Sequence, residues 1–369
     1  MKKRLITIVC LAVTCVLIWL APMLANGYPV EREGLIRSKG WEGTLRVWVC
    51  QGWSGGFNGW LNSTIAAFEK AHKGVRVRVQ QVQPGAWNVP NVVLPDIILF
   101  APGSMDNPQD ILKPFGKTNE FIEEAMRSGR WMGEQYALPV ALGGYIVLAN
   151  ESLYPEGRAL ADPGTYKKAK RYALAASGAG LVPLLAWDEG TAAARAWTMP
   201  DGFGLGTTDQ MYAKFTQGNV AALVTTLDYA RKFAAREAAG KGFVYRAETP
   251  FIMEESETPQ FCDMIIHVGR TKNSADSGRS AAADQLTFAL YSQESQSKLA
   301  SYGLVPSTPS VAIPQNYPLI GKIYQAYQTG LAVPNSFGWG ENREAFVNEA
   351  LYAVKNGGGA IYDTIERVR

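Results

Sequence analysis

The amino-acid sequence predicts an α/β protein with two lobes, and three patterns near its start support this. In residues 45–50 and 75–79 apolar and polar side chains alternate, as they do in half-buried strands. Residues 57–71 carry apolar side chains every three or four positions, as an amphipathic helix does. Residues 97–100 are apolar throughout, which suits a central strand buried on both faces. This order is typical of an open α/β sheet, and 369 residues are enough for two such cores.

A second series of elements follows along the chain. Residues 145–149 and 220–224 read as strands, and the Ala- and Gly-rich sequence between them favours helix. Asp228 is placed to cap a helix that runs to Gly240. The remaining predicted elements are a strand over 261–268, a helix over 281–302 and a C-terminal helix over 346–354.

The charge balance excludes several classes of function. The chain has 36 Lys and Arg against 33 Asp and Glu, and the surplus of three is Lys2, Lys3 and Arg4. A chain that is otherwise neutral has no net positive electrostatic field that would attract nucleic acid. Hydrophobic residues make up 47% of the chain and charged residues 19%, which excludes intrinsic disorder. The 40 Trp, Tyr and Phe residues (10, 16 and 14) provide many flat rings for binding.

The N-terminus predicts a location outside the cytoplasm. Three basic residues precede an apolar run from Leu5 to Leu20, so residues 1–25 are a signal peptide or an N-terminal membrane anchor. Lipidation at Cys15 is a third, weaker alternative, because the sequence before it departs from the usual pattern. Residues 26–44 are polar and form a tether.

Residues suited to metal or nucleophilic chemistry are few. The chain has two histidines, His72 and His267, and the body has two cysteines, Cys50 and Cys262. No zinc-binding spacing occurs, so we expect neither a metal nor a cofactor. The two cysteines could form a disulfide in an oxidising compartment, but two buried free thiols are the favoured alternative.

Several phrases in this order resemble the extracellular solute-binding proteins of ABC sugar importers, the group that includes maltose- and oligosaccharide-binding proteins. Together they extend over most of residues 45–354. The phrases are Val47-Trp48 with Gly52-Trp53-Ser54 and the helix end at 66–75, Pro95-Asp96-Ile97-Ile98, residues 136–150, residues 215–222, and residues 286–299 with Gly303-Leu304-Val305-Pro306.

The resemblance implies a two-lobed periplasmic-binding-protein-like fold of type II. Each lobe would be a mostly parallel sheet flanked by helices, and the hinge would have multiple crossings. The first lobe would comprise residues 45–140 plus 262–308, and the second would comprise 141–261 plus 309–369. The segment between Val82 and Pro95 lacks room for the helix that the family has there.

The resemblance also implies a function without a covalent step. The protein would be a monomer that captures a sugar or oligosaccharide by hinge closure and delivers it to the transmembrane subunits of an ABC permease. An alternative is a membrane-tethered sensor or receptor with the same fold. Binding of a metal chelate or phosphate through tyrosines is a weaker alternative, because Tyr302, Tyr324 and Tyr327 are better explained by helix packing.

Candidate ligand-binding residues follow the carboxyl ends of strands, where open α/β sheets bind ligands. Trp53 is equally suited to the lobe core, Asp228 to a helix cap and Asp263 to a solvated strand edge. Trp87 and Trp339 are weaker candidates in loops. The predicted ligand-binding residues are Trp53, Ser54, Pro102, Tyr145, Asp228, Tyr229 and Asp263.

A serine hydrolase is the main enzymatic alternative. Residues 52–56 match G-x-S-x-G between a strand and a helix, and Ser54, Asp228 and His267 follow the order of a catalytic triad. However, such a nucleophile normally follows several strands and an oxyanion loop, whereas only one strand precedes Ser54. We therefore expect no enzymatic activity.

Overall fold

The computed structural model of the protein describes residues 41–50, 52–116, 118, 120–153, 172–177, 185–188, 193–196, 204–248, 262–273, 276–331, 333–340, 343–344 and 360–361. The chain divides into two units, Met1–Glu42 and Gly43–Arg369, and all helices and strands described below belong to the second. The predicted N-terminal signal or anchor and the predicted C-terminal helix over 346–354 lie outside the described residues.

The first sheet has the strand order β2-β1-β3-β15-β4, and β7 also pairs with β15. β1 is parallel to β2 and β3, as predicted, while β15 is antiparallel to its three neighbours. The strands of this first sheet are β1 (Gly43–Cys50), β2 (Val75–Gln81), β3 (Ile97–Phe100), β4 (Leu112–Lys113), β7 (Leu138–Leu142) and β15 (Ile265–Thr271).

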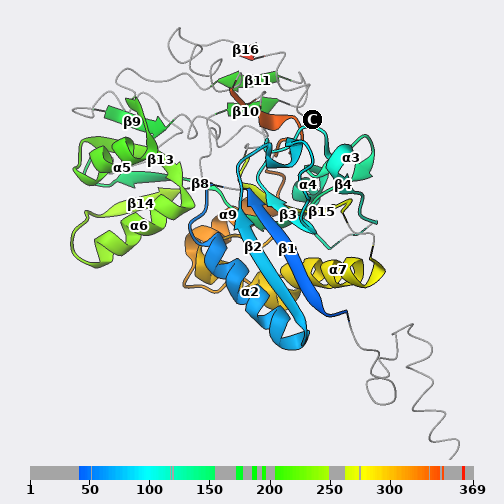
Figure 1. Ribbon diagram of the computed structural model, residues 1–369. Helices are drawn as coiled ribbons and strands as arrows, with labels where there is room; N and C mark the ends of the chain where they lie inside the picture. The colour runs from blue at the N-terminus through cyan, green and yellow to red at the C-terminus, as the bar shows by residue number, and fades with distance from the viewer. Residues whose placement is uncertain are drawn as a thin grey trace, which may run out of the picture. The chain divides into compact units, whose positions relative to one another are not determined.

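Helices α2 (Phe57–Ala71) and α7 (Ser277–Tyr291) pack against each other and against this sheet (Figure 1). The predicted single helix over 281–302 is wrong, because the backbone leaves the helical conformation at Ser292. The Ser292 side chain accepts a hydrogen bond from the Ser295 N–H and so starts a new helix. The chain therefore continues as α8 (Gln293–Lys298) and the 3₁₀ helix η4 (Leu299–Tyr302).

Asp96 holds the amino end of β3 in place. Its buried carboxylate accepts a hydrogen bond from the Arg46 N–H of β1 at 2.7 Å. The Arg279 guanidinium of α7 binds both carboxylate oxygens, at 2.7 and 2.8 Å. A bidentate pair of this kind fixes geometry as well as charge, so Asp96 ties two strands and a helix together.

The second sheet has the strand order β12-β9-β13-β8-β14. β9 is parallel to β12 and β13, whereas β8 is antiparallel to β13 and β14. Helices α5 (Thr208–Thr216) and α6 (Leu227–Ala238) pack on β13. The strands are β8 (Tyr145–Asn150), β9 (Tyr172–Ser177), β12 (Gly204–Gly206), β13 (Val220–Thr226) and β14 (Tyr245–Glu248).

Three local predictions elsewhere along the chain are wrong. The Ala-rich sequence between β8 and α5 contains strands rather than only helix, because pairing with neighbouring strands overrides the helix preference of alanine. The predicted strand over 261–268 begins only at Ile265. The N-cap of α6 is Thr226, and Asp228 lies in the first turn, where its charge still complements the helix dipole.

Shorter elements complete the described chain. β10, β11 and β16 form a separate antiparallel sheet, and β5 pairs with β6 as a hairpin. These elements are the 3₁₀ helix η1 (Ala86–Asn88), α3 (Pro108–Ile111), α4 (Glu123–Arg127), α9 (Pro318–Gln328), β5 (Arg130–Trp131), β6 (Glu134–Gln135), β10 (Leu185–Asp188), β11 (Ala193–Ala196) and β16 (Ala360–Ile361).

Candidate binding site at the crossing between the sheets

The chain passes from the first sheet to the second through Gly143 and Gly144, between β7 and β8. A Cβ atom on Gly143 would lie 2.5 Å from Cζ3 of Trp53, and one on Gly144 would lie 2.7 Å from side-chain atoms of Ile323. Both distances are shorter than van der Waals contact, so a side chain at either position would have to displace Trp53 or Ile323. The half-buried ring of Trp53 thus covers the crossing.

A second crossing lies beside the first, and a hydrogen bond joins them. The Tyr145 hydroxyl, at the start of β8, donates to Oδ1 of Asp263 at 2.7 Å. Asp263 lies two residues before β15 of the first sheet, and both side chains are buried. Two residues predicted to bind ligand are therefore brought together, and their polar groups bind each other.

The other oxygen of Asp263 is also occupied. Oδ2 accepts hydrogen bonds from Nε1 of Trp339 at 3.2 Å and from Nε of Arg343 at 2.7 Å. Burial disfavours the charged Arg343 guanidinium, but the charge and hydrogen bond of Asp263 outweigh this effect and raise its pKa. Burial and the Asp263 charge raise the Tyr145 pKa well above 10, so its hydroxyl keeps its proton.

The same crossing contains one of the two body cysteines. Cys50 and Cys262 are buried free thiols, which confirms the favoured prediction for them. The Tyr327 hydroxyl of α9 donates to Sγ of Cys262 at 3.2 Å. Burial, followed by the Asp263 charge, raises the Cys262 pKa to about 12, so the thiol is protonated and unreactive at neutral pH.

Helix α6 connects the second sheet to the loop that follows β1. The Gly55 N–H donates to Oδ2 of Asp228 at 3.0 Å. One turn further along α6, Nη1 of Arg231 donates to the Tyr302 carbonyl of η4 at 3.1 Å. Asp228, another predicted ligand-binding residue, therefore contacts the loop that carries Trp53.

Pro102 lies in the turn after β3, beside the segment that carries Trp339. The Gly103 N–H donates to the Ser336 carbonyl at 2.8 Å. A Cβ atom on Gly103 would lie 2.6 Å from the Gly340 nitrogen, so the two segments are in close contact. Pro102 is thus linked to the Asp263 network through residues 336–340.

Tyr229 follows Asp228 in α6 and contacts residues of α5. Its hydroxyl donates to Asp209 of α5, and this hydrogen bond, followed by partial burial, raises its pKa to about 12. Its ring centroid is 5.1 Å from that of Tyr212, and Nζ of Lys232 lies 4.0 Å above it. The described contacts of Tyr229 therefore join α5 and α6 on the second sheet.

The geometry gives no support to the hydrolase alternative. His267 is fully buried, with Nε2 at 2.9 Å from Oγ of Ser128 and Nδ1 at 3.3 Å from Oγ of Ser336. Burial lowers its pKa to about 3, so the ring is neutral at physiological pH. Asp228 accepts from a backbone N–H at Gly55, as described above, and Ser54 is itself buried.

Sequence reasoning missed Arg343 and undervalued Trp339. Both lie far from Asp263 in the chain, and neither belongs to a periodic pattern that would have placed it at a site. The pair Gly143-Gly144 was a usable signal, since two glycines between two strands indicate a close approach of backbone to other groups.

No group of three or more His, Cys, Asp or Glu residues within the described part of the chain is arranged to hold a metal ion. Of the helices that the structure describes, none combines the length and apolarity needed to cross a membrane.

Two α/β lobes joined by crossings of the chain form the fold of the type II periplasmic binding proteins, which confirms the predicted fold class. No family model and no curated protein sequence matches the chain. Among solved structures, the chain is similar to the extracellular solute-binding protein of Staphylococcus aureus in complex with maltose, with 14% identity, 88% of this chain and 94% of that chain covered, and a TM-score of 0.62.

Two further solved structures show the same likeness. The lacto-N-biose complex of the galacto-N-biose-/lacto-N-biose I-binding protein of the Bifidobacterium longum ABC transporter has 14% identity, covers 89% of this chain and 95% of that chain, and has a TM-score of 0.62. The maltotriose-bound MalE domain of Bdellovibrio bacteriovorus has 13% identity, 88% and 97% coverage, and a TM-score of 0.60. At these identities the likeness establishes the fold.

Proposed function

We propose that the protein is an extracytoplasmic solute-binding protein that captures a sugar or oligosaccharide and delivers it unaltered to an ABC importer. The observation that carries this proposal is the convergence of Trp53, Tyr145 and Asp228 from both lobes at the crossing. The likeness to solved binding proteins in complex with maltose, maltotriose and lacto-N-biose supports the sugar as ligand class.

The aromatic residues suit the apolar C–H faces of a pyranose, and polar groups nearby suit its hydroxyls. The hydroxyl of Tyr145 is engaged by Asp263 and its side chain is buried, so Tyr145 would position the crossing while Trp53 supplies the ring that contacts the sugar. The ring of Trp53 packs against Gly143 and is only half buried, which leaves part of it for a ligand.

Closure would follow from differential affinity. Contacts to ligand from both lobes exist together only when the lobes are closed, so binding favours that state. The hydrogen bonds Gly55–Asp228 and Arg231–Tyr302 join the lobes in the absence of ligand. Their lengths would change as the lobes move. We also propose that the protein acts as a monomer, without cofactor or enzymatic step, held outside the cytoplasm by its N-terminal segment or released there.

The test is a thermal-shift screen of the full-length chain with mono- and oligosaccharides, polyols and amino acids, followed by calorimetry on the hits. A ligand at a hundred times its dissociation constant stabilises by about 2.7 kcal/mol, which is easily detected. Trp53→Ala should fold and lose most of the shift, whereas Met132→Ala, at an 82% exposed position in the β5–β6 hairpin, should retain it. The proposal fails if no sugar stabilises the wild-type chain.

A further inference from the structure

Three turns of the same kind surround one cavity in the first lobe. In each, a proline is followed by a residue with positive φ, and the N–H of the fourth residue donates to the carbonyl of the first, the pattern of a type II turn. The residues with positive φ are Gly85 at 79°, Asn91 at 60° and Gly103 at 79°. The turns are residues 83–86, 89–92 and 101–104, with hydrogen bonds of 3.2, 3.1 and 3.2 Å.

The turns at 83–86 and 89–92 lie in the short segment between β2 and β3, and the turn at 101–104 follows β3. Each proline restricts the backbone before any ligand arrives, so the wall is preorganised and loses little entropy on binding. Trp87, which lies between the first two turns, is buried against the first sheet together with Trp48 and Met105. The wall is therefore anchored to the sheet core.

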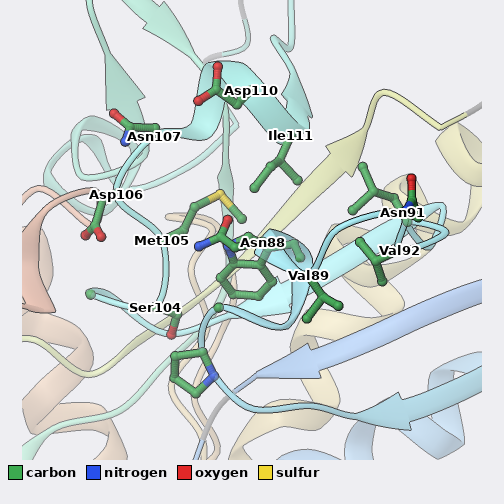
Figure 2. A pocket seen from close by; sticks show the side chains of 15 residues that line it. Asn88, Val89, Asn91, Val92, Ser104, Met105, Asp106, Asn107, Asp110 and Ile111 are labelled. Carbon is green, nitrogen blue, oxygen red and sulfur yellow. The ribbon is translucent and has the colours of Figure 1, made fainter.

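The cavity has a volume of about 510 Å³, within the range of roughly 300–1,000 Å³ typical of small-molecule sites. Figure 2 shows Asn88 and Met105 in its middle, with Asp106 to the left, Asp110 at the top and Val89 to the lower right. Val89 is 57% exposed, so the lining also presents an apolar surface to solvent.

The charges of the lining point to one class of ligand. Neither the Asp106 nor the Asp110 carboxylate has a hydrogen bond or ion pair with any residue that the structure describes. None of the 15 lining residues is Lys, Arg or His. Lys272 hydrogen-bonds the Gln109 carbonyl, but it does not line the cavity.

We propose that this cavity is a subsite for an amino sugar, whose ammonium group is attracted by the negative charges of Asp106 and Asp110. The amides of Asn88, Asn91 and Asn107 would bind hydroxyls, and Val89 would cover a C–H face of the ring. This inference rests on the proposed sugar-binding function and narrows its ligand class to saccharides that carry a free amine.

The expected preference is modest, because both carboxylates are exposed. Exposed ion pairs strengthen binding by about two- to fivefold each, so two give about tenfold over a neutral sugar of the same shape. The preference should weaken as salt is added, because salt screens exposed charges.

The experiment is calorimetric titration of the full-length chain with a glucosamine tetramer, an N-acetylglucosamine tetramer and maltotetraose. The first two differ by an ammonium group against a neutral amide. We expect about tenfold tighter binding of the glucosamine tetramer, and the loss of this preference in the Asp106→Asn/Asp110→Asn double variant. Glu123→Gln removes an exposed carboxylate that does not line the cavity, and it should keep the preference.

The outcomes separate the two proposals. Equal or tighter binding of a neutral tetramer would overturn the amino-sugar inference and leave the sugar-binding function standing. A preference that survives in the double variant would also overturn it. Binding of no saccharide would refute the sugar-binding function, and the subsite inference with it.

Discussion

Two sets of aspartates near the strand ends of the first sheet differ in their surroundings. Asp263 is 8% exposed and its carboxylate accepts hydrogen bonds from Tyr145, Trp339 and Arg343. Asp106 and Asp110 are exposed and have no such partner among the described residues. A carboxylate whose lone pairs are engaged within the protein holds the fold, whereas one that faces a cavity without partners has its charge free for a ligand.

The largest expected effect is that of Asp263→Ala. Removing this carboxylate would leave the Arg343 charge partly buried without its partner, and Tyr145 and Trp339 without their acceptor. We expect the free energy of unfolding to fall by about 3 kcal/mol, measured by urea denaturation. A loss below about 1 kcal/mol would mean that the network does not stabilise the crossing.

The next largest effect should be that of Gly143→Ala at the same crossing. The new methyl group would overlap the Trp53 ring, which costs about 2 kcal/mol. Gly52→Ala is the matched control, because nothing lies within 4 Å of a Cβ there. In the Gly143→Ala/Trp53→Ala double variant the clash with the ring disappears and only the 3.1 Å approach to Met264 Cβ remains, so its loss should be smaller than the sum of the two single losses. Additive losses would contradict the proposed contact.

A pH effect should distinguish the buried crossing from the exposed cavity. The Cys262 pKa is raised from 9.0 to about 12 in the folded protein, so the thiol stabilises the fold fully below pH 9 and loses that contribution as the pH rises toward 12. Between pH 9 and 10 the loss should be about 1 kcal/mol, measured by denaturation at each pH. Cys262→Ala should remove about 1 kcal/mol of the loss over this range, and the tyrosines with raised pKa values, such as Tyr145 and Tyr229, account for the slope that the variant keeps.

Cys50→Ala provides the comparison for that measurement. Burial also raises the Cys50 pKa, but a hydrogen bond with Ser104 opposes the shift. This variant should therefore reduce the slope less than Cys262→Ala does. An equal or larger reduction would place the alkaline sensitivity at Cys50 instead of at the crossing.

The smallest expected effect is that of Asp106→Asn or Asp110→Asn on stability. Because neither carboxylate has a protein partner in the described structure, each substitution should change the free energy of unfolding by less than about 0.5 kcal/mol. The same urea assay used for Asp263→Ala measures it. A loss comparable with that of Asp263→Ala would remove the distinction between the two sets of aspartates.

Much of the candidate site could be predicted from residue types next to strand ends. Trp53, Tyr145, Asp228 and Asp263 were all predicted, and the structure brings them to one crossing. Their partners could not be predicted, because Tyr145 and Asp263 are 118 residues apart in the chain. Whether a carboxylate faces ligand or protein depends on such distant partners.

The sequence by itself determined the elements whose pattern is local: the strands and helix of residues 45–100, where apolar side chains repeat every two or every three to four positions. Only the tertiary structure decided that the Ala-rich residues 172–177 form a strand, since they gain that conformation by pairing with β12 and β13. It likewise decided that Asp263 is enclosed while Asp106 is exposed. Periodicity lies within one segment, but pairing and desolvation arise when distant segments pack together.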